Sequence, residues 1–366
     1  MIRVLHVIDS FDLGGAQTVI LNLVRALDRS EFQLEVAAMH GAGPFKARLE
    51  AAGIPVHSLS RAKFPPEYLG NLPGLLARGN FQVVHFHLFG ANWIAKPLTA
   101  LLSDAVRIVH DHCNDALRYE NPLACWVDRL TNRLSDHIFC VSESTRDFLR
   151  AHERIPEEKL SVLANAVDTA EFRPVSAEVR RAARQKFALP AEARIIGGVG
   201  RLVPQKNFSR FLEIARLMPE AVFVIAGTGP LEAELKSAAP ANVRFLGFVE
   251  DRPGLYAALD ALLLTSLYEG MPMTVLEAMA AGVPVVSTKV DGVAEAFRDG
   301  REARILEGAA AADFAVALRE LPSQQDRLSA AARERIERDF SIAASARRLA
   351  EVYRLHLGIA SGPGMG

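Results

Sequence analysis

Residues 269–282 read EGMPMTVLEAMAAG, a stretch with the signals of a helix start in its middle. The apolar run 261–265 predicts a strand that leads into it. Pro272 suits the first turn of a helix, because its φ is already helical and it has no N–H to leave unpaired. The amides of Met273 and Thr274 would then point outward and form a site for a phosphate or another anion.

Two carboxylates flank this anion site. Glu269 lies in the loop before it, and Glu277 lies farther along the helix. A carboxylate accepts two hydroxyl hydrogen bonds, which suits the neighbouring hydroxyls of a ribose or a hexose. A diphosphate with a sugar on each side is a nucleotide sugar, and the stretch predicts a site for one. Each residue taken singly is also compatible with ordinary loop or cap chemistry.

Short apolar runs alternate with helical patterns through both halves of the chain. Such alternation implies parallel sheets covered by helices on both faces. The polar, turn-rich segment 165–176 lies between the halves, and the expected domains are 1–169 and 170–339. Ligands of such sheets bind beyond the carboxyl ends of the strands, so we expect the site in a cleft between the domains.

Composition excludes several classes of protein. The chain has 366 residues, enough for two domains, and a formal charge of −1, so no basic excess points to nucleic acid. Cys113, Cys125 and Cys140 have no metal-site spacing, which favours a reducing compartment. The sequence has neither a signal-peptide pattern at its start nor an apolar run near twenty residues. We therefore expect a cytoplasmic protein, and peripheral contact with the inner face of the cell membrane is compatible with the sequence.

The longer run 266–288, SLYEGMPMTVLEAMAAGVPVVST, resembles the nucleotide-sugar signature of retaining family 4 glycosyltransferases. GRLVPQKN at 200–207 resembles the family's phosphate clamp, and RFLGFVED at 244–251 the segment whose backbone reads the base. The resemblance covers nearly the whole chain. It implies the GT-B fold, with two Rossmann-like domains facing a cleft and a C-terminal helix, here 340–358, that returns to the first domain.

The resemblance implies roles for individual residues. Arg201 and Lys206 would neutralise the leaving diphosphate, Glu269 would hold the sugar ring and Glu277 the ribose. The donor-binding set is Gly14, Gly15, Arg201, Lys206, Gly247, Glu269, Gly270, Met271, Met273, Thr274 and Glu277. The catalytic set is His112, Arg201, Lys206 and Glu269.

Histidines gather at two predicted strand ends. His85 and His87 end one strand, and His110 and His112 end another. Alignment with the family favours His112 over His110 as the histidine near the sugar and the diphosphate. His85, His87 and His110 are then expected on the acceptor side.

No Asp-x-Asp pair occurs in the sequence. Glycosyltransferases of the other main fold hold a divalent ion with that pair, whereas Arg201 and Lys206 can supply the positive charge here. We expect metal-independent transfer with retention, no cofactor, and a UDP- or GDP-sugar as donor. The acceptor would be a glycan, a lipid-linked oligosaccharide or a small-molecule hydroxyl, as in polysaccharide or lipopolysaccharide synthesis. A nucleotide-sugar 2-epimerase and a non-catalytic nucleotide-sugar-binding subunit remain alternatives.

One predicted helix has features of a membrane-surface helix. Trp126, Arg129 and Arg133 recur at helical spacing, and Arg118 lies just upstream. An aromatic ring with cations on one helix face can rest on an anionic bilayer. Two nearby aspartates interrupt the positive charge, so a solvated helix face is the other interpretation.

Overall fold

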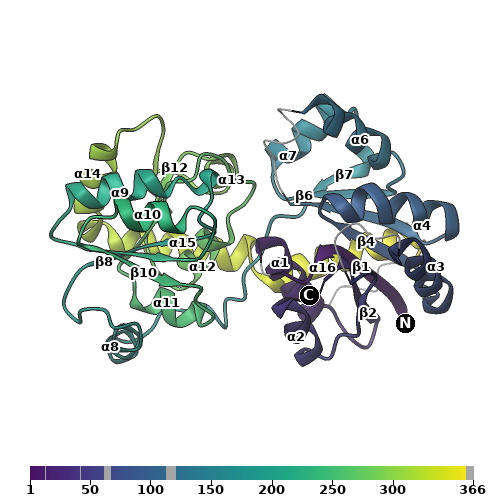
Figure 1. The fold of residues 1–366 in the computed structure, drawn as a ribbon, viewed down its shortest axis with the longest axis horizontal. Helices are drawn as coiled ribbons and strands as arrows, with labels where there is room; N and C mark the ends of the chain where they lie inside the picture. Colours follow the sequence, from purple (N-terminus) through teal and green to yellow (C-terminus); the bar gives the residue numbers. More distant parts are fainter. Residues whose placement is uncertain (13, 42, 62–66, 113–120, 360–366) are drawn as a thin grey trace. The chain divides into compact units, whose positions relative to one another are not determined.

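The structure is a computed structural model that describes residues 1–12, 14–41, 43–61, 67–112 and 121–359. By its internal contacts the chain divides into two units. The first comprises Met1–Asn165 and the segment from Ile342 onward, and the second comprises Ala166–Ser341. Each unit is a parallel sheet with helices on its faces (Figure 1).

Among its described residues, the first unit has a seven-stranded parallel sheet in the order β3-β2-β1-β4-β5-β6-β7. The strands are β1 (Ile2–Ser10), β2 (Phe32–His40), β3 (Val56–Ser58), β4 (Val83–His87), β5 (Val106–Asp111), β6 (His137–Cys140) and β7 (Leu160–Val162). The helices are α1 (Gly15–Ala26), α2 (Pro44–Ala51), α3 (Glu67–Gly79), α4 (Lys96–Leu102), α6 (Pro122–Asn132), α7 (Glu143–Phe148) and α16 (Ile342–His356). Two π-helical turns, η1 (Ala91–Ala95) and η2 (Leu149–Glu153), adjoin α4 and α7.

The two faces of this sheet have different partners. Leu5 and Val7 of β1 belong to a core that includes Leu72 of α3. His6 lies between them in sequence and therefore points to the opposite face. Both faces of the central strands are thus covered, which explains why they are nearly continuous apolar runs rather than alternating ones.

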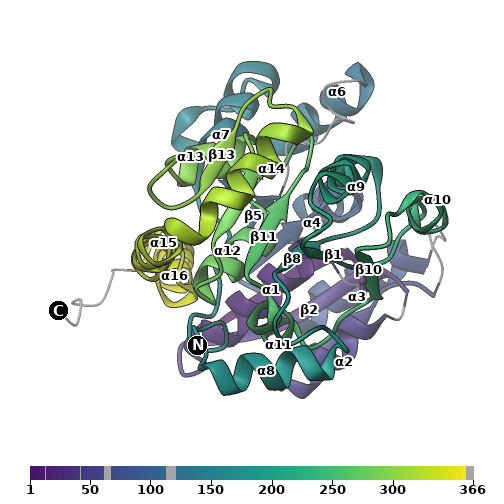
Figure 2. The same ribbon diagram turned by 90° about the vertical axis from the view of Figure 1, so that its left-hand side faces the viewer.

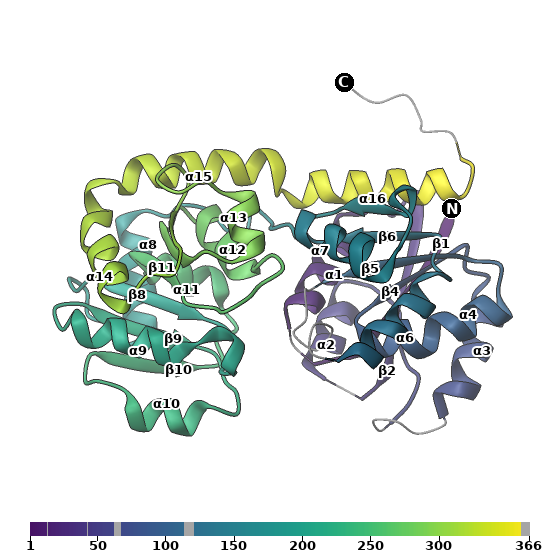
Figure 3. The ribbon, with the colours of Figure 1, turned by 90° about the horizontal axis from the view of Figure 1, so that it is seen from above.

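Helix α16 completes the first unit and lies along its sheet (Figure 3). Tyr353 is fully buried on it and packs edge-on against the ring of Phe32 in β2. Arg354 makes two hydrogen bonds, of 2.6 and 2.5 Å, to the carboxylate of Glu31. Because Tyr353 reaches the sheet itself, α16 forms part of the core of this unit.

The second unit has, within the described residues, a six-stranded parallel sheet in the order β10-β9-β8-β11-β12-β13. The strands are β8 (Ile195–Val199), β9 (Val222–Ala226), β10 (Val243–Gly247), β11 (Ala261–Leu264), β12 (Val285–Thr288) and β13 (Arg304–Leu306). The helices are α8 (Ala177–Lys186), α9 (Phe208–Leu217), α10 (Glu232–Ala238), α11 (Arg252–Ala258), α12 (Met273–Ala280), α13 (Asp291–Ala296), α14 (Ala311–Glu320) and α15 (Gln325–Asp339). Helices α8 and α11 cover one face and α9, α10 and α14 the other (Figure 2).

In both sheets the strand order reverses next to the first strand. The reversal lies between β1 and β4 in the first sheet and between β8 and β11 in the second. Such switch points open a crevice at the carboxyl ends of the strands, where doubly wound proteins bind ligands. Most of the predicted site residues lie at or beyond the ends of these four strands, whereas Gly247 ends β10 and His110 and His112 lie at the end of β5. Nowhere in the described part of the chain is a helix long and apolar enough to cross a membrane.

Candidate active site

The second unit places two predicted cations beyond the carboxyl end of β8. Arg201 follows the strand closely, and Lys206 ends a short 3-10 turn before α9. Gly227 keeps the neighbouring β9 loop close, because a Cβ there would lie 1.9 Å from the carbonyl oxygen of Gly200. Only glycine permits that approach. Both cations therefore lie at the switch point of their sheet.

Lys206 and Glu269, both predicted from the sequence, form an ion pair. Lys206 Nζ donates a hydrogen bond to Glu269 Oε1, and Ser266 Oγ donates to the same oxygen at 2.7 Å. The two side chains are only 16% and 9% exposed, so their attraction is screened less than it would be in water. Ser266, which carries no sequence signal of its own, helps to hold Glu269 in place.

Arg201 has different surroundings. The residue is exposed, and its side chain has no hydrogen bond or ion pair with any residue that the structure describes. Its guanidinium therefore remains available to an incoming anion. Two parallel N–H donors match the geometry of a phosphate group well, so this side chain suits the predicted phosphate contact.

Helix α12 begins slightly later than the sequence predicts. Pro272 is its N-cap rather than its first residue, with a φ of −73° and a ψ of 117°. The amide of Val275 donates to Pro272 O at 3.1 Å. The amides of Met273 and Thr274 have no partner among the described residues. The predicted pair of unpaired N–H groups at the helix start is therefore present, and a ligand anion would satisfy them.

The loop before α12 is held by close packing. A Cβ on Gly292 would lie 1.5 Å from the carbonyl oxygen of Gly270, so the start of α13 lies directly against this loop. Met271 and Met273 are buried. Their side chains support the loop from within, and any contact that they make with a donor would come through their backbone. Thr274 Oγ1 is buried and has no hydrogen-bond partner in the described part of the chain.

Glu277 is buried and already has two partners. Arg252 donates a hydrogen bond to its Oε2, and Tyr256 Oη donates to the same oxygen at 2.9 Å. Burial raises the pKa of Glu277, and the guanidinium beside it opposes that rise. Its Oε1 has no partner among the described residues, so one oxygen remains for a ribose hydroxyl. Arg252 and Tyr256, one turn apart on α11, were not predicted as site residues.

Gly247 ends β10 in a conformation that favours glycine. Its φ is +66°, and its carbonyl oxygen accepts a hydrogen bond of 2.7 Å from Gly227 N. The next residue, Phe248, is 56% exposed. An aromatic side chain that stays in solvent beside a turn is a candidate to stack on a base, which the sequence pattern alone did not indicate.

In the first unit, the predicted glycine loop leads into α1. Gly14 is the N-cap, with extended backbone, and the first turn carries no acidic residue. A Cβ on Gly15 would meet nothing within 4 Å, whereas a Cβ on Gly14 would lie 2.6 Å from Gln17 Oε1. Asp9, at the end of β1, accepts a hydrogen bond of 2.8 Å from Ala91 N and therefore has a structural role.

The predicted histidines meet on one face of the first sheet, joined by a fifth. In the register, His6 of β1 lies beside His85, and His87 lies beside His110. His85, His87 and His110 are fully buried. These three side chains therefore lie beneath the surface, and their place on the acceptor side stays a prediction. His112, which is only partly buried, is the one member of the predicted set that remains near solvent.

Burial keeps these histidines neutral. It lowers the pKa of His6 to about 3 and that of His110 to about 4. The pKa values of His85, His87 and His112 are lowered well below the ordinary value, again mainly by burial. A neutral imidazole has one N–H and one lone pair, so each ring can donate one hydrogen bond and accept one.

Two histidine trios bring three ring nitrogens within 4.8 Å of one another: His6, His85 and His87, and His87, His110 and His112. They are the candidate metal ligands among the described residues. Two further residues named from the sequence, Cys113 and Arg118, lie outside the described residues.

Two family models match the chain. Residues 13–171 match the model described as Glycosyltransferase Family 4, and residues 193–324 match the model described as Glycosyl transferases group 1. The chain belongs to glycosyltransferase family 4. This result confirms the resemblance found in the sequence, and neither match describes an epimerase or a binding subunit.

Individual glycosyltransferases are similar over most of the chain. A putative glycosyltransferase, EpsF of Bacillus subtilis, is 29% identical over 306 residues, 78% of each chain. The UDP-Gal:alpha-D-GlcNAc-diphosphoundecaprenol alpha-1,3-galactosyltransferase of Escherichia coli is 25% identical over 320 residues, 80% of each chain. The structure of Anabaena Alr3699/HepE in complex with UDP and glucose matches with a TM-score of 0.85 at 20% identity, covering 96% of this chain and 99% of that one. The predicted GT-B fold is confirmed.

Proposed function

We propose that this family 4 glycosyltransferase transfers a hexose from a UDP- or GDP-sugar, with retention at the anomeric carbon and without a metal ion. The observation that carries the proposal is the grouping of Arg201, Lys206 and Glu269 around one switch point, in the unit whose helix α12 offers unpaired amides. The names of two relatives agree with such a donor: one uses UDP-Gal, and another has been solved with UDP and glucose.

Each group has a defined role in this proposal. Arg201, Lys206 and the N-terminus of α12 bind the diphosphate, which needs positive charge and N–H donors as it leaves. Glu269 accepts hydrogen bonds from the hexose hydroxyls, and Oε1 of Glu277 accepts from the ribose. Gly247 presents backbone atoms to the base. In the first unit, Gly14 and Gly15 at the start of α1 would offer backbone amides to an anion.

The transfer step needs no further co-reactant. The bond between the anomeric carbon and the phosphate oxygen breaks, and the acceptor hydroxyl oxygen forms its bond on the same face of the sugar. The leaving phosphate takes the proton of that hydroxyl, which balances the step. Lys206 then has two anionic neighbours, Glu269 and the phosphate. Because it already donates to Glu269, it would hold the sugar site and the phosphate site in a fixed relation.

We propose that the acceptor is lipid-linked and that α6 rests on the membrane. Four apolar side chains form an exposed stripe on or just after this helix: Leu123, Trp126, Leu130 and Leu134. The opposite face, with Ala124, Asp128 and Asn132, is buried. Asp128 is fully buried and accepts a hydrogen bond of 2.6 Å from Trp93 Nε1, so its carboxylate does not lie at the surface. A Trp-containing apolar stripe beside arginines suits an anionic bilayer.

A thermal-shift panel of nucleotide sugars, followed by turnover assays with and without EDTA, tests the function. We expect a UDP- or GDP-sugar to stabilise the protein, since ligand at a hundred times its Kd adds about 2.7 kcal/mol. Turnover should be undiminished in EDTA, and the product should keep the anomeric configuration of the donor. A strict requirement for magnesium or manganese would overturn the metal-independent mechanism, and an inverted product the retaining one.

A further inference from the structure

Two donors on helix α11 fix one oxygen of the Glu277 carboxylate. Arg252 and Tyr256 stand four residues apart on this helix, so both side chains lie on the same face. The guanidinium of Arg252 and the hydroxyl of Tyr256 donate to a single oxygen, Oε2 of Glu277. Tyr256 is fully buried, whereas the side chain of Arg252 is 25% exposed. The carboxylate is thus held at Oε2 by one buried donor and one donor that reaches the surface.

The remaining atoms of this pair are open to a ligand. Oε1 of Glu277 has no hydrogen-bond partner among the described residues, and it is not one of their fully enclosed, unpaired side-chain atoms. The same is true of Nη1 of Arg252. An unpaired acceptor and an unpaired donor therefore reach the surface of the second unit on two directly bonded side chains. Such a pair suits a hydroxyl group, which donates one hydrogen bond and accepts another.

The other glutamate of the site is held in the same way. Lys206 and Ser266 both donate to Oε1 of Glu269, and Oε2 has no partner in the described part of the chain. In each case a cation and a hydroxyl occupy one carboxylate oxygen and leave the other oxygen free. Arg252 thus stands to Glu277 as Lys206 stands to Glu269.

The surroundings of Glu277 also set its charge. Burial raises the pKa of Glu277, while the guanidinium of Arg252 and the hydrogen bond from Tyr256 oppose that rise and nearby Glu171 adds to it. Helix α15 also packs on α12, but its Arg333 donates to a backbone carbonyl at the far end of α12. An ionised carboxylate only accepts hydrogen bonds, whereas a protonated one also donates. Loss of the guanidinium would therefore change what Oε1 can bind.

Glu277 lies on the same face of α12 as the open start of that helix. Thr274 and Glu277 are three residues apart, and residues with this spacing share a helix face. The amides of Met273 and Thr274 have no partner among the described residues. One helical turn spans only about 5.4 Å, so a ligand whose phosphate binds these amides can place an adjoining ribose at Oε1.

We propose that Arg252 is a positioning residue that holds Glu277 ionised, with Oε1 free for a ribose hydroxyl, and that the site thereby selects ribonucleotides over deoxyribonucleotides. This inference rests on the proposed role of Glu277 in donor binding. A fixed acceptor rejects an analogue without the hydroxyl, because the acceptor is then left unpaired in a site closed to water.

Calorimetric titration with UDP and GDP, each compared with its 2′-deoxy and 3′-deoxy forms, tests this selection. We expect the wild type to bind the ribonucleotide at least about tenfold more tightly than one of its deoxy forms. Arg252→Met keeps the bulk of the side chain without its charge and should lose the preference, whereas Arg252→Lys should restore most of it. Tyr256→Phe is the matched control and should keep the preference, since the cation remains. A preference retained in Arg252→Met would overturn the proposal.

Carbon-13 NMR of glutamate-labelled protein reads the state of Glu277 without a ligand. The carboxyl resonance of Glu277 is identified by its absence from Glu277→Gln. At neutral pH we expect an ionised Glu277 in the wild type and a protonated one in Arg252→Met, because burial then acts without an opposing charge. The ribonucleotide preference of Arg252→Met should return as the pH rises and Glu277 ionises, which a misfolded variant would not show.

The two measurements separate this proposal from the proposed function. A Glu277 resonance that is the same in Arg252→Met and the wild type would overturn the positioning role of Arg252. If the wild type binds neither UDP nor GDP, the proposed function fails, and the resonance still shows whether Arg252 controls the charge of Glu277.

Discussion

Arg201 and Lys206 carry the same charge, but only Lys206 has a partner that its removal would leave unpaired. Glu269 is buried and receives its hydrogen bonds from Lys206 and Ser266. Arg201 is exposed and has no side-chain partner in the described part of the chain. The two cations should therefore differ in what they contribute to stability, although we propose that both bind the diphosphate.

We predict that Arg201→Ala lowers kcat at least about tenfold, because a charge-assisted hydrogen bond to the leaving phosphate is lost. Its melting temperature should match that of the wild type. Lys206→Ala should show a similar loss of kcat and a lower melting temperature, since Glu269 is then buried without its cation. Steady-state kinetics and calorimetric melting measure both effects. Equal melting temperatures for the two variants would contradict the structural role of the ion pair.

The two glutamates are predicted to differ in ligand preference. Glu269→Ala should bind free nucleoside diphosphate normally and lose affinity for the nucleotide sugar, because the proposed contact of Glu269 is with the hexose. Glu277→Ala should weaken binding of both ligands, because the proposed contact of Glu277 is with the ribose. Calorimetric titration of both ligands decides the matter. Tyr256→Phe removes one hydrogen bond from Oε2 of Glu277 and serves as a control that should leave Oε1 and ribose binding intact. Equal losses in all four titrations would disprove these roles.

Arg201 and Lys206 were predicted from the resemblance of residues 200–207 to the family's phosphate clamp, and Glu269 from its place in the loop before a predicted helix start. The sequence did not predict Arg252 and Tyr256, because a one-turn spacing on a short helix is common. Their role is visible only once α11 packs beside α12. The sequence also placed Pro272 one position too deep in its helix, since an N-cap and a first helical residue differ only in ψ.

At the scale of single elements, α6 has an exposed apolar face for which we propose contact with a membrane. Its buried residues recur every four positions, at Ala124, Asp128 and Asn132, and this spacing leaves the exposed apolar stripe on the other side. Trp126 is 57% exposed. The sequence predicted the helix and its arginines but not the stripe, because burial of Asp128 against Trp93 could not be read from spacing.

We predict that the protein co-sediments with vesicles of anionic lipid at low salt and is released as salt rises, because screening weakens surface charge. The double variant Arg129→Glu with Arg133→Glu should lose this binding while keeping donor affinity. Arg173→Glu with Arg181→Glu is the matched control, since it makes the same charge change on exposed residues of the second unit. Wild-type protein that ignores vesicles at low salt would favour a soluble acceptor.

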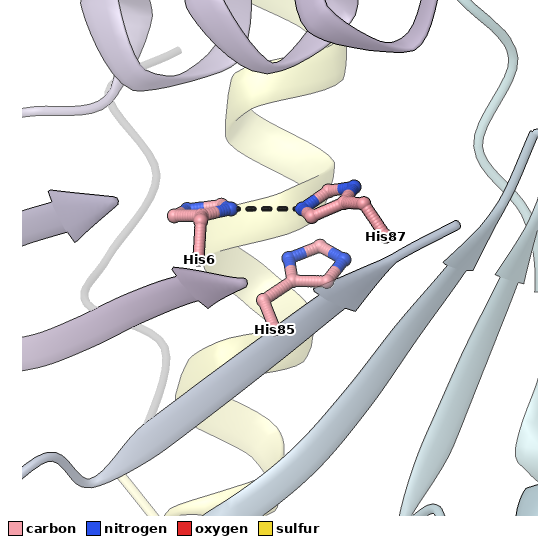
Figure 4. A group of neighbouring side chains, drawn as sticks. All are labelled: His6, His85 and His87. Atoms are coloured by element: carbon pink, nitrogen blue, oxygen red, sulfur yellow. Dashed lines mark hydrogen bonds between the residues drawn. The ribbon is translucent and has the colours of Figure 1, made fainter. Parts of the chain in front are cut away.

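At the scale of the whole molecule, the alternation of strands and helices was enough to predict two parallel sheets, and the fold class is confirmed. It was not enough to predict which strands are neighbours. His6 lies beside His85 because β1 pairs with β4, although 78 other residues separate them in the sequence. The sequence did not single out His6, yet its Nδ1 lies 3.0 Å from His87 Nε2 in the folded unit (Figure 4).

The buried histidines give the first unit a distinct dependence on pH. Their pKa values in the folded state lie below the ordinary 6.5, at about 3 for His6 and about 4 for His110. Between these values and 6.5, the unfolded chain binds protons that the folded chain does not. Stability therefore rises with pH in this window and falls as acid is added. Each such histidine contributes a slope of about 1.4 kcal/mol per pH unit.

We predict that acid unfolds the first unit through this window, and that His110→Leu flattens the slope by the contribution of one histidine. Both tryptophans of the chain, Trp93 and Trp126, belong to this unit, so their fluorescence reports its unfolding in urea. The free energy of unfolding is measured from neutral pH down to about 4, with each variant normalised to its own value at neutral pH. Because the leucine cannot be protonated, a slope equal to that of the wild type would mean that His110 is already charged in the folded unit.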